Sequence, residues 1–531
     1  MDNFDADVVI VGSGFLGTFV ALELLNAGKS VIILEAGPEL ADWKVTENYR
    51  SSPRKGNFND PFGEVPWAPN SQTKGYFTSD SGDVSNLPGG TLRIAGGTSR
   101  HWTGSTWRLL PEDMKLKTLY GVGRDWPVTY NELEPFVTEA EYYIGVNGVD
   151  SDDQSGGPYS HYPPRSKPFP LPPEAKSYMT QYIQMQLAEV GMKVVHAPCT
   201  RISQPYKGRP GCIGNNMCQP HCPIGARYSG IMSLKDATDK GARLITHAVV
   251  DRIIKGEGNR IKALSYQTPE GERKTVTAKK FVIAGHGYET PKLLLLNDIA
   301  NSSSMVGRNL MCHPGLNFSF LAELELWQGR GPFISGAILD RRNLPDRDKL
   351  ASLHYDILNI NWTTEITAEL LKRKKWLGTS LDEKIRRDLS QYIFIQSMAE
   401  DLPEPGNNVT INRNWKDSLG LPGLHIHYRL NDYTRALKLR IENDYANMLR
   451  AIRGDRLSPP QNWNAEDHIM GTVIMGDNPA DSVVDRNLRT HDHENLFLVT
   501  TGVFPSSSSV NPTLTAMALA IRAGRLIAGE V

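Results

Sequence analysis

The chain has 531 residues, of which 40% are hydrophobic and 22% are charged, and its formal net charge is −1. This is ordinary globular composition, long enough for two or three domains, and the balanced charge does not indicate a nucleic-acid partner. The chain has no apolar run of about 18 residues and no basic stretch before "DADVVIVG", so its own residues predict neither a membrane span nor a secretory signal.

The first forty residues predict a strand, a glycine-rich turn, a helix and a second strand. Val8 to Val11 form a short apolar strand, and Gly12, Gly14 and Gly17 follow it as G-x-G-x-x-G. Glu35 ends the second strand, "SVIILE", where an acid hydrogen-bonds a ribose hydroxyl. The pattern predicts dinucleotide binding but does not by itself separate FAD from NAD. A tight turn without a ligand would explain the glycines but not Glu35.

Three of the five cysteines lie in the loop "GCIGNNMCQPHC", residues 211–222, as Cys212, Cys218 and Cys222. Glycine, asparagine and proline surround them, so we expect an irregular loop whose thiolates suit a soft metal. The spacing differs from that of common ferredoxin runs. A zinc site that adds His221 has acceptable ligand types but unusual spacing, and reduced cysteines without a metal are the third interpretation.

The middle of the chain alternates apolar and polar residues. Between 242 and 285, turn signals at 256–258 and 269–271 separate several predicted strands. Residues 315–455 contain the alternating segments "FISGAILD", "NNVTINRNW" and "LHIHYRL" together with a helical pattern. We predict a substrate domain here, with a sheet on one side and helices on the other.

The C-terminal segment combines "HIMGTVIMG", a buried strand "NLFLVTTG" and a helix that opens at Pro512 in "NPTLTAMALAIRAGRLI". With the N-terminal dinucleotide pattern, this module resembles the glucose–methanol–choline oxidoreductases, FAD enzymes that oxidise alcohols. "FVIAGHGYETPKLLL" (281–295) and "VGRNLMCHP" (306–314) match the same family. The resemblance therefore runs from the first strand to the last helix.

The resemblance implies catalytic roles for His468 and Asn511, because a histidine before Met-Gly and an Asn or His before Pro face the flavin in that family. A neutral imidazole can accept the hydroxyl proton at neutral pH, and Asn511 can hold the same oxygen. Besides the N-terminal residues, the family pattern implies further cofactor contacts at Gly97, His101, Thr103 (near the flavin N5), Val250 (at the adenine), Gly502 and Pro512.

The segment "GGTSRHWT" also looks like the part of pyranose oxidases in which a histidine bonds covalently to the flavin. That histidine falls on His101. The alternative is that His101 packs against FAD without a covalent bond.

The cysteine loop resembles that of the flavin subunits of bacterial membrane-bound sugar dehydrogenases. There, one cysteine per iron holds a three-iron, four-sulfur (3Fe-4S) cluster, so the resemblance implies this cluster on Cys212, Cys218 and Cys222. It also implies a multihaem cytochrome c partner, a small companion subunit that carries an export signal, and contact with the membrane only through partners. We expect the periplasmic face, with the cytoplasm as the alternative.

We therefore expect an α/β (α+β) fold: a Rossmann-like FAD-binding domain, discontinuous in sequence, with a substrate domain built on an antiparallel sheet flanked by helices. The FAD-binding domain is predicted over 1–125, 196–314 and 456–531, with 126–195 as a connection and part of the substrate domain, which continues over 315–455. The predicted activity is FAD-dependent oxidation of a sugar or polyol hydroxyl. An oxygen-using sugar oxidase and a non-catalytic flavin electron-transfer subunit are the alternatives.

Overall fold

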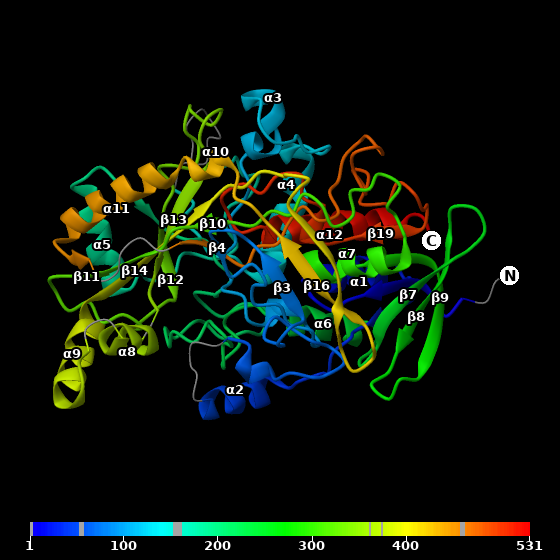
Figure 1. The fold of residues 1–531 in the computed structure, drawn as a ribbon, viewed down its shortest axis with the longest axis horizontal. Coiled ribbons are helices and arrows are strands. Elements are labelled where there is room, and N and C mark those ends of the chain that lie inside the picture. The colour runs from blue at the N-terminus through cyan, green and yellow to red at the C-terminus, as the bar shows by residue number, and fades with distance from the viewer. Residues whose placement is uncertain (1–3, 53–57, 152–161, 361–362, 373–374, 457–461) are drawn as a thin grey trace.

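The structure is a computed structural model that describes residues 4–52, 58–151, 162–360, 363–372, 375–456 and 462–531. Two large sheets lie toward opposite ends of an elongated molecule, and both chain termini lie at the end that holds the first sheet (Figure 1). No helix in these ranges combines the length and apolarity that crossing a bilayer requires.

The first sheet has seven strands and is parallel at its centre. Its strands pair in the order β6 (Arg243–Ile245), β2 (Val31–Leu34), β1 (Ala6–Val11), β9 (Arg273–Ile283), β8 (Ile261–Gln267) and β7 (Val249–Lys255), with β19 (Leu496–Leu498) also parallel to β9. The long strand β9 pairs antiparallel with β8 over its first half and parallel with β1 and β19 over its second half. It therefore joins the dinucleotide sheet to an antiparallel meander.

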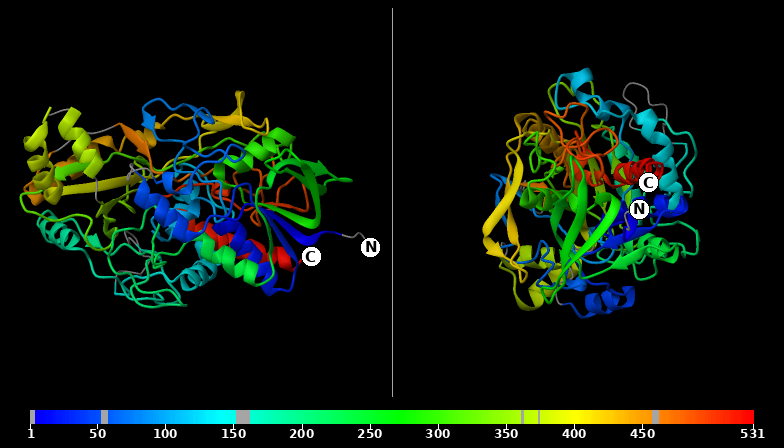
Figure 2. Two further views of the ribbon diagram at one scale, coloured as in Figure 1. Left: turned by 90° about the horizontal axis from the view of Figure 1, so that it is seen from below. Right: turned by 90° about the vertical axis from the view of Figure 1, so that its right-hand side faces the viewer.

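Helices from both ends of the chain pack together beside this sheet. The helices concerned are α1 (Phe15–Asn26), α4 (Tyr130–Ile144), α6 (Gly230–Asp239), α7 (His286–Asn297) and α12 (Thr513–Ala528). The last helix, α12, packs against α1 and α4, and Figure 2 shows α12 beside α1. Gly524 permits this close approach, because a Cβ there would lie 2.7 Å from Cβ of Glu23.

The second large sheet is antiparallel throughout. Its strand order is β17 (Asp455–Arg456), β11 (Phe318–Leu321), β14 (Tyr392–Ala399), β13 (Leu353–Leu358), β12 (Ile334–Ile338) and β5 (Val194–Val195). Helices α5 (Tyr178–Ala188) and α11 (Lys438–Ile452) cover one face, while α8 (Thr363–Lys372) and α9 (Gly378–Gln391) lie near β11 and β14 (Figure 1).

Successive side chains along β13 and β14 point to opposite faces of this sheet, and the two faces have different surroundings. Tyr355, Ile357 and Ile395 belong to the apolar core with α5 and α11. Their neighbours in sequence, among them Asp356 and Gln396, point to the opposite face and line a cavity.

Two three-stranded sheets lie between the large ones. One is β10 (Pro314–Gly315), β18 (Trp463–Ala465) and β4 (Val84–Ser85), and the other is β15 (Asn408–Lys416), β16 (Pro422–His427) and β3 (Phe77–Asp80). The shorter helices are α2 (Asp42–Ser51), α3 (Leu116–Tyr120) and α10 (Asp432–Arg435), with 3₁₀ turns η1 (Asp60–Phe62), η2 (Thr98–Arg100), η3 (Pro111–Met114) and η4 (Thr501–Val503). The predicted fold class is confirmed. The predicted domain boundaries stay a prediction, since strand pairing defines sheets and not domains.

We expect Gly471→Ala to lower the midpoint of thermal unfolding more than Gly420→Ala does. Both glycines have a positive φ, +85° and +78°, so alanine is strained at either position by roughly 1–2 kcal/mol. A Cβ at Gly471 would also lie 1.9 Å from the carbonyl oxygen of Asn309, whereas nothing lies within 4 Å of one at Gly420. This overpacking destabilises the folded state by about 1–3 kcal/mol more. Calorimetry measures both midpoints, and equal midpoints would contradict the tight packing at Gly471.

Candidate active site

One cavity of about 750 Å³ joins the two large sheets. One end lies at the carboxyl ends of β1 and β2, where Gly12, Gly14 and Glu35 line it. The other end lies against the cavity-facing residues of β13 and β14 and contains His468 and Asn511. A single elongated space therefore connects the predicted dinucleotide site with the predicted catalytic pair.

The three glycines of the first turn have different surroundings. A Cβ at Gly12 would lie 2.6 Å from the Ala284 carbonyl oxygen, and one at Gly17 would lie 2.1 Å from the Gly12 carbonyl oxygen. At Gly14 the nearest atom would be 3.9 Å away, so its backbone faces open cavity at the amino end of α1. An exposed backbone at a helix amino terminus fits the pyrophosphate of a dinucleotide such as FAD. Gly17 packs beneath the turn and does not line the cavity.

Glu35 is held in place by the turn that it faces. Its carboxylate accepts hydrogen bonds from the backbone N–H of Ser13 (3.1 Å), the hydroxyl of Ser13 (2.6 Å) and the backbone N–H of Gly37 (3.0 Å). Burial raises the pKa of this carboxyl. Each carboxylate oxygen has two lone pairs, so the group retains the capacity to accept a ribose hydroxyl. Val250 lines the same end of the cavity.

Gly97, His101 and Thr103 line the middle of the cavity. A Cβ at Gly97 would lie 3.3 Å from Cα of Gly14, so the two backbones face each other. His101 donates a hydrogen bond from Nε2 to the carbonyl oxygen of Gly90 (2.6 Å), and burial lowers its pKa to about 4. His101 is therefore a neutral imidazole with a fixed ring orientation at neutral pH.

His468 and Asn511 lie in hydrogen-bond contact. The Nδ2 atom of Asn511 lies 3.0 Å from Nε2 of His468, and Nδ1 of His468 lies 2.8 Å from Nδ1 of His313. Burial, together with His313 and His354, lowers the pKa of His468 well below its ordinary value. The Oδ1 atom of Asn511 is buried without a partner in the described part of the chain. Pro512 lines the cavity next to this pair, whereas Gly502 packs against Thr472 and Val473 outside it.

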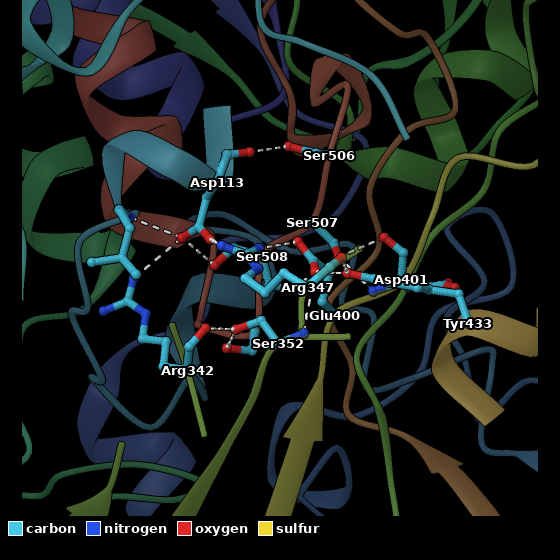
Figure 3. Close-up of polar contacts among 12 residues, drawn as sticks. Asp113, Arg342, Arg347, Ser352, Glu400, Asp401, Tyr433, Ser506, Ser507 and Ser508 are labelled. Carbon is cyan, nitrogen blue, oxygen red and sulfur yellow. Dashed lines mark hydrogen bonds and ion pairs between the residues drawn. The ribbon is translucent and has the colours of Figure 1, made fainter. Parts of the chain in front are cut away.

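Four consecutive buried serines, 506–509, fix the segment that leads to Asn511, and Figure 3 shows the first three of them. Each hydroxyl has its own partner: Ser506 donates to the carbonyl oxygen of Asp113 (2.8 Å), Ser507 to the carbonyl oxygen of Asp401 (2.9 Å), Ser508 to the carboxylate of Asp113 (2.7 Å), and Ser509 pairs with the hydroxyl of Ser352 (2.8 Å). The run 506–509 is therefore clamped along its length.

A buried ionic group anchors this clamp. Arg347 lies between two carboxylates, with Nη1 at 2.9 Å from Asp113 and Nη2 at 2.8 Å from Glu400 (Figure 3). Burial alone would raise the pKa of Asp113, but the charges of Arg347 and Arg342 hold it below its ordinary value. Asp113 is therefore an anion, a strong acceptor for Ser508.

A row of polar groups crosses the cavity face of the second sheet. Asp356 lies directly opposite Gln396 on the neighbouring strand, and Gln396 donates to the carboxylate of Glu466. Glu466 also accepts from Asn317 (2.9 Å) and Asn464 (3.1 Å), and burial raises its pKa to about 7. The Oδ1 atom of Asp356 is buried with no partner among the described residues. These five residues, which we call the polar row, present hydrogen-bonding groups to a ligand.

The cysteine loop lies next to the middle of the cavity. Gln219, within the loop, lines the cavity and donates to the carbonyl oxygen of His101 (3.1 Å). Cys218 and Cys222 are buried, Cys212 is half-buried, and the sulfur of Cys212 accepts from the N–H of Gly214 (3.4 Å). In the described ranges no group of three or more histidine, cysteine or carboxylate side chains is arranged to hold a metal ion. The donor types suit a cluster, but the geometry does not establish one.

Sequence reasoning missed several residues of this site. His313 lies in the quoted segment "VGRNLMCHP" and the serines in "FPSSSSVNP", yet their contacts come from residues far away in the sequence. No sequence motif marks the residues of the polar row. Alternation of apolar and polar residues in the strands could have indicated an inward-facing polar position, but not which cavity it faces.

Comparison with known proteins gives full-length similarities. The family models described as GMC oxidoreductase match residues 183–315 and 403–520. The chain is 37% identical to the fructose dehydrogenase large subunit of Gluconobacter japonicus, covering 100% of this chain and 99% of that one. It is 28% identical to a 2-methyl-1,2-propanediol dehydrogenase of Mycolicibacterium austroafricanum, covering 98% and 95%.

Two solved structures share the fold. A pyridoxine 4-oxidase from Mesorbium loti has a TM-score of 0.63 at 17% identity, with 98% of this chain and 99% of that chain covered. A formate oxidase of Aspergillus oryzae has a TM-score of 0.66 at 15% identity, with 100% and 99% covered.

We expect Gly14→Ala and Gly17→Ala to separate cofactor binding from folding. At Gly14 a methyl group enters open cavity beside the expected pyrophosphate, so FAD content should fall while the unfolding midpoint of the apoprotein stays near that of wild type. At Gly17 the methyl meets backbone at 2.1 Å, so both should fall. Flavin absorbance after gel filtration and the midpoint of the apoprotein measure this. If the Gly14→Ala variant keeps its full FAD content, the pyrophosphate does not bind at this turn.

Proposed function

Because the chain belongs to the GMC oxidoreductases, with the FAD-binding fold of that family, we propose that it oxidises one hydroxyl of a sugar or polyol. The observation that carries this proposal is the position of the polar row. The polar row and the His468–Asn511 pair line the same cavity. The other end of this cavity has the features of a dinucleotide site. A substrate with several hydroxyls can satisfy both the pair and the row.

The chain's own groups account for the proton and for orientation. Desolvation lowers the pKa of His468, so its imidazole is neutral at pH 7 and the unprotonated nitrogen can accept the hydroxyl proton. The amide of Asn511 lies 3.0 Å from that imidazole and would hold the reacting oxygen. FAD, when bound, supplies the two-electron acceptor for the hydride that leaves the carbon bearing this hydroxyl. The substrate loses one proton and one hydride and becomes a carbonyl compound.

The polar row supports a polyhydroxylated substrate. Asp356 has an unpaired, buried oxygen, and such a group costs stability unless a ligand or water satisfies it. Apolar side chains, including Leu358 and Phe394, line the cavity beside the row. The name of one relative, fructose dehydrogenase large subunit, supports a sugar as the substrate.

For electron exit, we infer that Cys212, Cys218 and Cys222 hold a three-iron cluster, which when bound would exchange single electrons. The support is the donor type of the loop, the N–H···S contact at Cys212, and the link from Gln219 to His101 at the cavity wall. Burial raises the pKa of the Cys218 thiol to about 11, and the buried cations Arg201 and Arg227 act in the opposite direction.

The proposed partners are a multihaem cytochrome and a small companion subunit with an export signal, at the periplasmic face of the membrane. A relative named as a large subunit supports an assembly with other subunits. Coexpression with the companion followed by fractionation tests the location, and active enzyme that stays in the cytoplasm would defeat it. A covalent bond from His101 to the flavin is also a proposal. Yellow cofactor left in the supernatant after acid precipitation would exclude it.

Wild-type enzyme should lose its flavin colour when mixed anaerobically with one or more members of a panel of sugars and polyols. His468→Ala should slow this reduction by roughly 100-fold or more, because the proton acceptor is removed, while FAD stays bound. Burial lowers the pKa of His468, so the acid limb of kcat/KM that it causes should lie below pH 6.5, its ordinary value.

Stopped-flow absorbance measures the reduction, and Asn511→Ala, which keeps the base, should be less severe. Near-wild-type reduction by His468→Ala would exclude it as the base. If no sugar or polyol of the panel bleaches the flavin, the proposed function fails, and a non-catalytic flavin subunit is favoured. Stoichiometric peroxide without an added acceptor would favour a sugar oxidase.

Cys218→Ser should lose iron while it retains FAD, whereas Cys199→Ser should retain both. Cys199 is a matched control because it is buried nearby and interacts electrostatically with Cys218, but lies outside the loop. Iron content and low-temperature EPR measure the cluster, and flavin absorbance measures the FAD. Zinc in place of iron, or iron unchanged in Cys218→Ser, would contradict the cluster.

A further inference from the structure

His313 and His468 face each other across a short antiparallel ladder. The backbone groups of Met311 and Met470 exchange two hydrogen bonds of 3.0 Å, and the N–H of Glu466 donates to the carbonyl oxygen of His313 (3.1 Å). The imidazole of His313 is buried and that of His468 is half-buried, with ring centroids 4.9 Å apart and ring planes inclined by 76°. The backbone therefore fixes the contact between the two Nδ1 atoms, which lie 2.8 Å apart.

The proton positions in this contact follow from its far end. The Nε2 atom of His313 lies 3.3 Å from the carbonyl oxygen of Ser507, which can only accept, so Nε2 carries the proton. Burial lowers the pKa of His313 to about 4, so the ring is neutral and its Nδ1 has a lone pair. Nδ1 of His468 must then donate. Because His468 is also neutral, its Nε2 is unprotonated and faces Asn511.

We propose that His313 is a positioning residue that fixes the tautomer of His468, so that Nε2 keeps the lone pair that here accepts from Nδ2 of Asn511 and that a substrate hydroxyl would engage in its place. This rests on the proposed function, in which Nε2 is the proton acceptor. The orientation originates at the carbonyl of Ser507, in the run 506–509, and passes through His313 to His468. Without an acceptor at Nδ1, the other tautomer, with a proton on Nε2, becomes accessible and cannot act as a base.

A neutral partner suits this role better than a carboxylate. In the described structure no carboxylate is hydrogen-bonded to either ring, and the neighbouring His354, which interacts electrostatically with both, has its Nε2 atom 3.6 Å from the carboxylate of Asp356. An adjacent anion would favour the charged form of His468 and reduce the fraction of free base. His313 accepts the Nδ1 proton without adding negative charge, and it keeps that contact after Nε2 has been protonated.

Two substitutions separate orientation from packing. In His313→Gln, the side-chain oxygen can accept from His468 while its N–H₂ donates to Ser507, so the tautomer should persist and anaerobic flavin reduction should stay within several-fold of wild type. In His313→Leu the acceptor is lost, and reduction should slow roughly 100-fold, with FAD content unchanged. If His313→Leu does not fold, His313→Met provides a flexible apolar replacement.

A spectroscopic measurement does not depend on turnover. In FAD-loaded protein labelled with ¹⁵N-histidine, a two-bond ¹H–¹⁵N correlation spectrum should show an unprotonated Nε2 for His468. The signals of His468 are assigned by their disappearance in the His468→Asn variant. The same tautomer should appear in His313→Gln, and a mixture should appear in His313→Leu. A protonated Nε2 in wild type, or equal reduction rates in wild type and His313→Leu, would overturn the proposal. If no alcohol reduces the wild-type flavin, the proposed function fails, and the tautomer in the spectrum alone decides the role of His313.

Discussion

The buried carboxylate of Asp113 is the contact on which the geometry of the active site depends. It accepts from Ser508 and from the N–H of Leu110, and it is paired with Arg347, which also pairs with Glu400. Ser508 has a φ of +59°, a conformation that costs a non-glycine residue roughly 1–2 kcal/mol. Because removal of one member of a buried ion pair costs about 3–5 kcal/mol, the ionic group can hold such a strained run in one conformation. Asn511 follows that run after one residue, Val510.

The second sheet illustrates how one element serves stability and recognition at once. The odd-numbered apolar residues of β13 and β14 pack in the core with α5 and α11, while the residues that line the cavity are even-numbered: Asp356, Leu358, Phe394, Gln396 and Met398. Asp356 and Gln396 can therefore be polar without placing a polar group in the core. Changes on the cavity face alter ligand recognition with little effect on packing, which suits a fold whose relatives act on different substrates.

The fold was largely predictable because its signals are local. The turn of Gly12, Gly14 and Gly17 and the alternation in the strands depend on residues close in sequence, and the structure agrees with both expectations. The contacts around the catalytic pair are not local: Ser508 meets Asp113 across 395 positions, and His313 meets His468 across 155. No pattern within a short window encodes such pairs. Cys199 likewise looked isolated in sequence but lies close enough to Cys218 to interact electrostatically.

The packing of α12 between α1 and α4 has a consequence for biosynthesis. At roughly 5–20 residues per second, a ribosome needs about 30–110 s to make a chain of 531 residues. Until α12 has been synthesised, the faces of α1 and α4 that it covers remain exposed, and the part of the cavity wall formed by Asn511, Pro512 and Thr513 is missing. The cofactor site is therefore incomplete until residues 511–528 have been synthesised and have packed against α1 and α4.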